Sequence, residues 1–128
     1  PYTDQKILMM LAFADKGHDY REYNEIPEIR SFPSYITYAD LVLSFASKAH
    51  GMDVYMNHVG ATESVAFGDS LNDYEMLQHA TVSVAMGQGE NRLKEISDVV
   101  TKPVDEDGIA YAIDVLQVLQ NEKIKGEQ

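Results

Sequence analysis

One short segment of the chain carries the residues best suited to chemistry. Phe67-Gly68-Asp69-Ser70-Leu71-Asn72-Asp73 closes an apolar run that begins at Ser64. A strand that ends in Gly-Asp delivers a carboxylate to the carboxyl edge of a parallel sheet, where ligands bind in open α/β folds. Asp69 and Asp73 are four residues apart, so a turn and a helix start can aim both at one point. Two such carboxylates suit Mg²⁺, which prefers oxygen ligands and retains waters.

The same spacing also has a purely structural explanation. Asp69 and Ser70 can cap the following helix, and Asn72 can be a turn residue. In the functional interpretation, the Asn72 amide orients a carboxylate or contacts a substrate oxygen. Spacing alone leaves the two interpretations equally open.

Lys48 is the second candidate for a chemical role. It falls in the first turn of an expected helix that Ser47 can N-cap, where a cation opposes the helix dipole. A nearby phosphate would offset that cost, because lysine acts as a point charge on phosphate. A solvated surface lysine is the commoner explanation of one such residue.

The elements that must position these residues follow from hydrophobic periodicity. From Ser47 onward, helices alternate with short apolar runs, which indicates parallel β/α units. Apolar residues at i, i+3, i+4 and i+7 predict a first and a last helix: Met52, Tyr55, Met56 and Val59, ending at Gly60, and Ile109, Ala112, Ile113 and Leu116. Between them we predict strands at 64–67, 82–86 and 98–101, and helices through 74–77 and over 90–96. This is a doubly wound series.

The first 46 residues have a different pattern. The run from Ile7 to Phe13 fits a helical face or a strand equally well. Residues 15–29 are polar, and Pro27 limits any helix there. Residues 35–45 have the β-branched and aromatic character of one long strand or a strand pair. We therefore divide the chain into segments 1–45 and 46–128.

Composition excludes several classes of function. The chain has 10 Lys+Arg against 21 Asp+Glu and a net charge of −11, which argues against a nucleic-acid partner. It has no cysteine, so disulfides and thiolate metal sites are excluded, and its four histidines lack ligand-like spacing. No apolar stretch approaches the roughly 20 residues that cross a membrane. We expect a cytoplasmic protein with no membrane partner.

Residues 46–113 resemble the C-terminal half of the Cof-type phosphatases of the haloacid-dehalogenase (HAD) superfamily. The resemblance rests on the order and spacing of five motifs: Ser47-Lys48-Ala49, the segment 64–73, Met76-Leu77, Val84-Ala85-Met86-Gly87 and Asp105-Glu106-Asp107-Gly108-Ile109-Ala110. It implies an α/β fold, with the C-terminal half of a HAD-like Rossmannoid three-layer core (parallel strands) in 46–128. Residues 1–45 would be the C-terminal part of an α+β cap, which favours a strand for residues 7–13.

The resemblance also implies roles for individual residues. Lys48 would steady the phosphoryl group and the nucleophile, and Asn72 would approach the substrate phosphate. Asp69 would ligate Mg²⁺ directly, and Asp73 would hold a metal-bound water or lie just behind the ligands. The expected catalytic residues are thus Lys48, Asp69 and Asp73. Lys48 and Asn72 are expected to bind substrate, and Asp69 and Asp73 to bind the metal.

Two family motifs are missing from the sequence ahead of Lys48. HAD phosphatases carry an Asp-x-Asp motif whose first Asp attacks phosphorus and whose second is the general acid/base, followed by a Ser/Thr motif. Neither precedes residue 48 here. Asp105-Glu106-Asp107 has the spacing, but it precedes the last helix and is interpreted as a solvated loop and helix cap. Gln88-Gly89 also stands where the family usually has Asn-Ala.

We therefore predict a fragment of a Mg²⁺-dependent phosphatase that hydrolyses small, sugar-phosphate-like phosphomonoesters through an aspartyl-phosphate. Alone it is expected to be inactive. Its expected partners are a small phosphorylated metabolite and either the missing N-terminal half or a second copy, which would cover an open sheet edge. The alternatives are a HAD-type sugar phosphomutase and a non-catalytic binding or regulatory module with half a HAD core. A receiver-type signalling domain fits the order from Lys48 to Asp73 less well.

Overall fold

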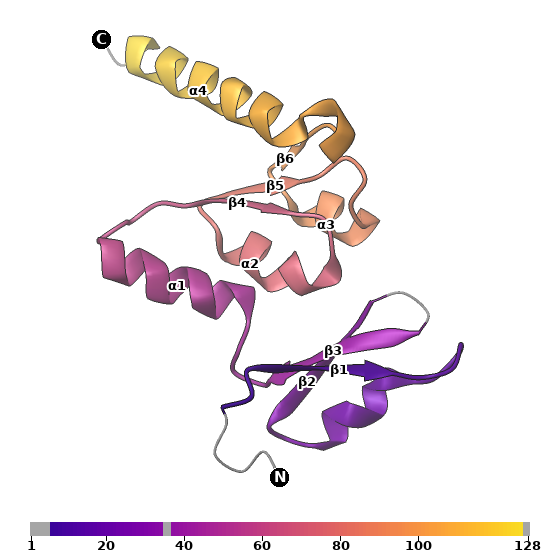
Figure 1. Cartoon of the computed structure of the whole chain (residues 1–128). Helices are drawn as coiled ribbons and strands as arrows, with labels where there is room; N and C mark the ends of the chain where they lie inside the picture. Colours follow the sequence, from indigo (N-terminus) through magenta and orange to yellow (C-terminus); the bar gives the residue numbers. More distant parts are fainter. Residues whose placement is uncertain (1–5, 35–36, 127–128) are drawn as a thin grey trace. The chain divides into compact units, whose positions relative to one another are not determined.

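The computed structural model describes residues 6–34 and 37–126 (Figure 1). The chain divides into two compact units, Pro1–Ser47 and Lys48–Gln128. This division lies two residues beyond the end of the first segment expected from the sequence. Among the described residues, no helix combines the length and the apolar character that a membrane crossing requires.

The first unit is built on an antiparallel sheet. Its strands are β1 (Met9–Phe13), β2 (Ile29–Ser34) and β3 (Tyr38–Leu43), in the order β1-β3-β2. A 3₁₀ helix, η1 (Tyr20–Glu25), ends before Pro27 and packs beside β2. The central strand β3 alternates in burial and puts Ala39 and Leu41 inside. The run from residue 7 to 13 therefore contains a strand, and residues 38–43 form a single one; residues 35 and 36 lie outside the described part.

The second unit is built on a parallel sheet. Strands β4 (Val65–Gly68), β5 (Val82–Ala85) and β6 (Val99–Val100) follow one another in the order β4-β5-β6. The connections hold α2 (Tyr74–His79), preceded by the 3₁₀ turn η2 (Leu71–Asp73), and α3 (Asn91–Ile96). Helix α1 (Lys48–Val59) precedes β4, and α4 (Gly108–Gly126) follows the turn η3 (Val104–Glu106). In Figure 1, α4 lies on the opposite side of this sheet from α1 and α2, which makes three layers. The predicted α/β class is confirmed.

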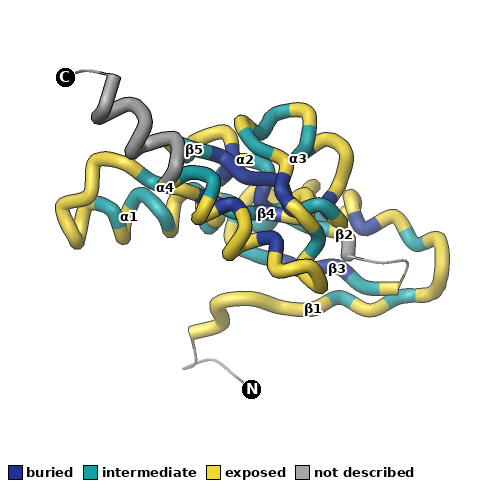
Figure 2. The backbone as a smooth tube through the Cα atoms, turned by 90° about the horizontal axis from the view of Figure 1, so that it is seen from above, coloured by how far each residue is buried: buried dark blue, intermediate teal, exposed yellow. Residues whose placement is uncertain are grey.

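The core of the second unit lies between the sheet and the helices α2 and α3. Its fully buried large side chains are Leu77 of α2 and Leu93 of α3, which cluster with Ala66 of β4 and Ala85 of β5. In Figure 2 the buried positions follow the middle strand β5 and its neighbours. Met86 is buried and Met76 packs against the same cluster, so both methionines pack in the core as their apolar character suggests.

The outer helices bury less than their sequence periodicity suggests. On α1, Met52 and Met56 are half-buried, but Tyr55 is 66% exposed and Val59 is 52% exposed. On α4, Ala112 is buried, whereas Ile109 and Ile113 are exposed. Periodicity located both helices correctly. It overstated their burial: α1 packs mainly against α2 and η2, and only part of its apolar face is covered there.

The predicted boundaries of these helices have clear local causes. Helix α1 ends at Gly60, whose φ of 70° is left-handed, and the N–H of Ala61 donates to the Met56 carbonyl over 2.9 Å. This is the hydrogen bond of a Schellman C-cap. Before α4, the residues Asp105, Glu106 and Asp107 form an exposed turn, which supports their interpretation as a solvated loop.

A hydrogen-bonded carboxylate links β5 to the start of β6. The backbone N–H and the hydroxyl of buried Ser83 both donate to Asp98 Oδ2 over 2.8 Å, and the Asp98 N–H donates to Ser83 Oγ over 3.0 Å. These hydrogen bonds hold the pKa of Asp98 below its ordinary value, and the bond from the Ser83 backbone N–H contributes more than the bond from its hydroxyl. The lowered pKa means that the charged form stabilises the folded chain above the unfolded-state pKa of about 3.9.

The first prediction concerns this carboxylate. Asp98→Asn keeps the shape and one acceptor oxygen but removes the charge, so its melting temperature should fall a few degrees below wild type at pH 7. The difference should shrink as the pH falls below about 4, where the wild-type carboxylate also becomes protonated. Thermal melts between pH 2 and pH 7 measure it. Asp114→Asn, on the exposed surface of α4, is the control and should show no such convergence. A difference in melting temperature between Asp98→Asn and wild type that does not change with pH would contradict the stabilising role of the charged carboxylate.

Candidate active site

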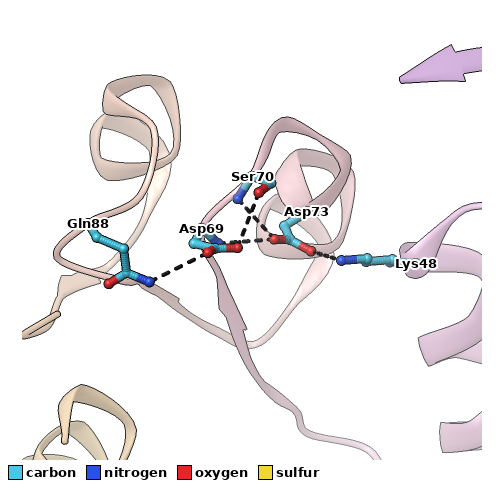
Figure 3. Close-up of polar contacts among 5 residues, drawn as sticks. All are labelled: Lys48, Asp69, Ser70, Asp73 and Gln88. Atoms are coloured by element: carbon cyan, nitrogen blue, oxygen red, sulfur yellow. Dashed lines mark hydrogen bonds and ion pairs between the residues drawn. The ribbon is translucent and has the colours of Figure 1, made fainter. Parts of the chain in front are cut away.

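The carboxyl end of β4 carries Gly68 and the two aspartates that follow it. Gly68 is the last strand residue and is buried. A Cβ on Gly68 would lie 2.6 Å from Asp73 Cβ and 3.1 Å from Leu77 Cδ1. Only a residue without a side chain therefore lets the turn η2 fold back onto the strand end. This close approach places Asp69 and Asp73 at the same edge of the sheet (Figure 3).

Asp73 is turned inward and ties three segments together. It is 3% exposed, and its Oδ2 accepts the backbone N–H groups of Asp69 (3.0 Å) and Ser70 (3.1 Å). Its Oδ1 forms an ion pair with the ammonium of Lys48, at the start of α1. Both carboxylate oxygens are thus engaged by the protein itself. The residue holds the strand end, the turn and the helix start in one arrangement.

Lys48 has a partner that the sequence did not predict. Its ammonium is predicted to face a phosphate, which stays a prediction, and in the structure it pairs with the buried Asp73 carboxylate. This pair accounts for a cation at a helix N-terminus. The Lys48 side chain is 49% exposed, and its ammonium has three N–H donors. N–H donors therefore remain to bind an anion from solution.

Asp69 faces outward and is held from two sides. The Ser70 hydroxyl donates to Oδ1 over 3.3 Å, and Gln88 Nε2 donates to Oδ2 over a long 3.5 Å. The backbone carbonyl of Asp69 accepts the Glu90 N–H over 3.0 Å. Ser70 and Gln88 were not among the predicted site residues. Adjacency of parallel strands could have indicated Gln88, because the loop after β5 must lie beside the loop after β4.

Asn72 presents an unsatisfied polar atom at the same place. Its Oδ1 is buried and has no hydrogen-bond partner within the described part of the chain. A buried polar atom without a partner costs free energy, and such atoms are usually satisfied by water or a ligand. All four predicted site residues therefore lie on the second unit, with Lys48, Asp69 and Asp73 joined by hydrogen bonds.

The arrangement fits part of a magnesium site. Residues 6–34 and 37–126 contain no cluster of three His, Cys, Asp or Glu side chains that would hold an ion alone. Asp73 is buried and accepts three hydrogen bonds, whereas Asp69 is exposed and accepts one on each oxygen, so Asp69 has more lone pairs open to an ion from solution. One or two carboxylates, with waters and substrate phosphate oxygens, are the usual environment of Mg²⁺. Asp69 suits direct coordination of Mg²⁺, and Asp73 suits a position behind the metal ligands.

Comparison with known proteins places this geometry in a family. The model of the haloacid dehalogenase-like hydrolases matches residues 2–113. YkrA of Bacillus subtilis, named provisionally as a phosphatase, is 36% identical over 121 residues, which are 93% of this chain and 47% of YkrA. A solved HAD subclass IIB sugar phosphatase is 33% identical with a TM-score of 0.79, over 91% of this chain and 45% of that one. A solved protein of Geobacillus kaustophilus is 34% identical with a TM-score of 0.76, over 91% and 46%.

This chain spans about half the length of each of these three proteins. The matched residues include the β4 motif, Lys48 and most of both units. The chain therefore belongs to the haloacid dehalogenase-like hydrolases.

Proposed function

We propose that this chain supplies the phosphate- and metal-facing part of a Mg²⁺-dependent phosphatase that acts on small, sugar-phosphate-like phosphomonoesters. The observation that carries the proposal is the junction of Lys48, Asp73 and Asp69 at the carboxyl end of β4. It places a half-exposed cation and an outward carboxylate at one edge of a parallel sheet, where α/β folds bind ligands. The similarity to a sugar phosphatase supports the substrate class.

Each residue has a role that follows from its surroundings. Asp69 would hold Mg²⁺, which when bound neutralises charge on the transferring phosphoryl group. Lys48, kept in place by Asp73, would contact a phosphoryl oxygen with its remaining donors. Asn72 would orient the substrate: a half-turn of its amide lets the unsatisfied position offer either an acceptor or two donors to a phosphate.

The nucleophile is proposed to come from a polypeptide segment outside these 128 residues. No Asp-x-Asp motif precedes Lys48 in this sequence. In the proposed reaction, a carboxylate of that segment attacks phosphorus and displaces the alcohol. Water then hydrolyses the aspartyl-phosphate and releases inorganic phosphate. We propose that the antiparallel unit of residues 1–47 is the C-terminal part of the cap domain of this family.

A metal titration tests the role of Asp69 without depending on activity. In ¹H–¹⁵N spectra of the chain, MgCl₂ should shift the amide signals of Asp69, Ser70 and Gln88. Asp69→Asn keeps the size of the side chain but removes the charge, so these shifts should disappear. Asp105→Asn, in the exposed turn before α4, is the matched control and should respond as wild type does. Equal shifts in Asp69→Asn, or none in wild type, would refute the metal role.

A phosphatase assay tests the reaction. The full-length protein should release phosphate from hexose phosphates only with Mg²⁺, and Asp69→Asn should abolish that release. The 128-residue chain alone should release none. Mg²⁺-dependent turnover by the chain alone, lost in Asp69→Ala, would refute the external nucleophile. An isomerised sugar phosphate in place of free phosphate would identify a phosphomutase instead.

A further inference from the structure

Gln88 joins the Asp69 carboxylate to the turn after β6. Its Nε2 donates to Asp69 Oδ2 over 3.5 Å, and its Oε1 accepts the N–H of Val104, the first residue of η3, over 3.0 Å. In Figure 3 the Gln88 amide points at Asp69 from the loop that follows β5. One side chain thus spans the loops that follow all three parallel strands.

The bond to Val104 determines which end of the Gln88 amide faces Asp69. A reversed amide would set its NH₂ against the Val104 N–H and its oxygen against the Asp69 carboxylate. Both contacts would then be repulsive, donor against donor and acceptor against acceptor. The bond to Val104 therefore orients the NH₂ group of Gln88 toward Asp69.

Gly89 brings this loop into direct contact with the Asp69 backbone. A Cβ on Gly89 would lie 2.9 Å from Asp69 Cα and 3.1 Å from its carbonyl oxygen. The same carbonyl accepts the Glu90 N–H. The loop thus cannot move away from Asp69 without breaking a bond, and a larger residue at position 89 would push it away.

We propose that Gln88 is a positioning residue, which holds the Asp69 carboxylate in the orientation that receives Mg²⁺. The inference rests on the proposed function only in taking Asp69 as the metal ligand. Asp69 is exposed, and a free carboxylate would lose rotational entropy on binding an ion. Ser70 on Oδ1 and Gln88 on Oδ2 remove that freedom beforehand and leave lone pairs for the metal.

The length of the side chain is part of the proposal. An asparagine at position 88 would be one methylene shorter, and because the Gln88 contact with Asp69 is already long at 3.5 Å, we expect asparagine not to keep both bonds. An alanine at position 89 would bring its Cβ to 2.9 Å from Asp69 Cα. Gln88 and Gly89 therefore act as a pair: the glycine lets the loop approach, and the glutamine spans to the η3 turn.

The first test uses the metal-free chain. Three-bond couplings about the Asp69 Cα–Cβ bond report its rotamer populations, and hydrogen exchange reports protection of the Val104 amide. Wild type should show one dominant Asp69 rotamer and a protected Val104. Gln88→Met keeps the length without polar atoms, and Gln88→Asn keeps the amide without the reach; both should average the rotamer and expose Val104. Gln78→Met, on the exposed side of α2, is the control and should match wild type. A single rotamer retained in both Gln88 variants would overturn the proposal.

The second test measures magnesium directly. Gln88→Met and Gln88→Asn should raise the Mg²⁺ dissociation constant of the chain about threefold to tenfold. This is at or below the smallest loss of metal affinity that is usual when a group supporting a metal ligand is removed. In the full-length protein they should raise the Mg²⁺ concentration for half-maximal rate and leave kcat at saturating Mg²⁺ unchanged. Unchanged Mg²⁺ affinity would overturn the proposal. A wild-type chain with one Asp69 rotamer but no Mg²⁺ binding would refute the metal role of Asp69 and leave its positioning by Gln88 supported.

Discussion

Asp73→Asn is expected to lower the free energy of unfolding by about 3 kcal/mol, although the two side chains have the same shape. The Asp73 carboxylate faces the Lys48 ammonium with one oxygen and two backbone N–H groups with the other. An amide has only one acceptor end. Whichever way the substituted amide turns, its NH₂ meets either the ammonium or the N–H pair, so a buried donor stays unsatisfied. Denaturant unfolding at pH 7 measures the loss.

A double-mutant cycle with Lys48→Met separates this mechanism from a general loss of packing. Without the ammonium, the NH₂ of the introduced asparagine can occupy the vacated side while its oxygen accepts both N–H groups. Asp73→Asn should therefore destabilise the Lys48→Met background at least about 1 kcal/mol less than the wild type. An equal loss in both backgrounds would mean that the ion pair is not the cause. The full-length Asp73→Asn protein should also lose phosphatase activity, because Lys48 and the β4 turn would no longer be held.

Gly68→Ala is expected to have an effect of similar size, about 3 kcal/mol, at the upper end of the usual cost of overpacking. Its new methyl group would lie 2.6 Å from Asp73 Cβ and 3.1 Å from Leu77 Cδ1. Both neighbours are buried and cannot swing into solvent. The turn must therefore separate from the strand end, which also displaces the carboxylate that Lys48 binds.

Gly51→Ala is the matched control for this substitution. Gly51 lies within α1, and a Cβ there would meet no atom within 4 Å. Alanine should stabilise that helix by about 0.5–1 kcal/mol. Two Gly→Ala changes in one unit are thus expected to shift unfolding midpoints in opposite directions. A Gly68→Ala chain as stable as wild type would show that the strand end is not closely packed against η2.

The sequence predicted most of the fold because its signals are local. Gly60 ended α1, Pro27 lay beyond η1, and each short apolar run became a strand. The helical faces were less well predicted: Tyr55 and Ile113 follow the apolar period and are nevertheless exposed. Periodicity reports which side of a helix is apolar, but not how much of that side its neighbours in the fold will cover.

The site shows the same division between local and long-range information. A spacing of four residues suggested that a turn aims Asp69 and Asp73 at one point; both do follow β4, but Asp69 faces outward and Asp73 is buried. It could not show that Asp73 turns inward, since this depends on backbone N–H groups that only the folded turn presents. The partner of Lys48 and the approach of Gln88 depend on pairing between distant segments, which no local pattern encodes. The metal role of Asp73 remains a prediction.

The order of the parallel strands bears on how the protein is made. Because β4, β5 and β6 lie in the sheet in the order in which they occur in the chain, each strand pairs with its immediate predecessor. The sheet can then grow from its N-terminal strand during synthesis, one crossover at a time, with only short loops to close. Lys48 and Asp73 both precede β5 in the chain. Their ion pair can therefore form while β6 and α4 are still inside the ribosome, before the contact of Gln88 with Val104 completes the site.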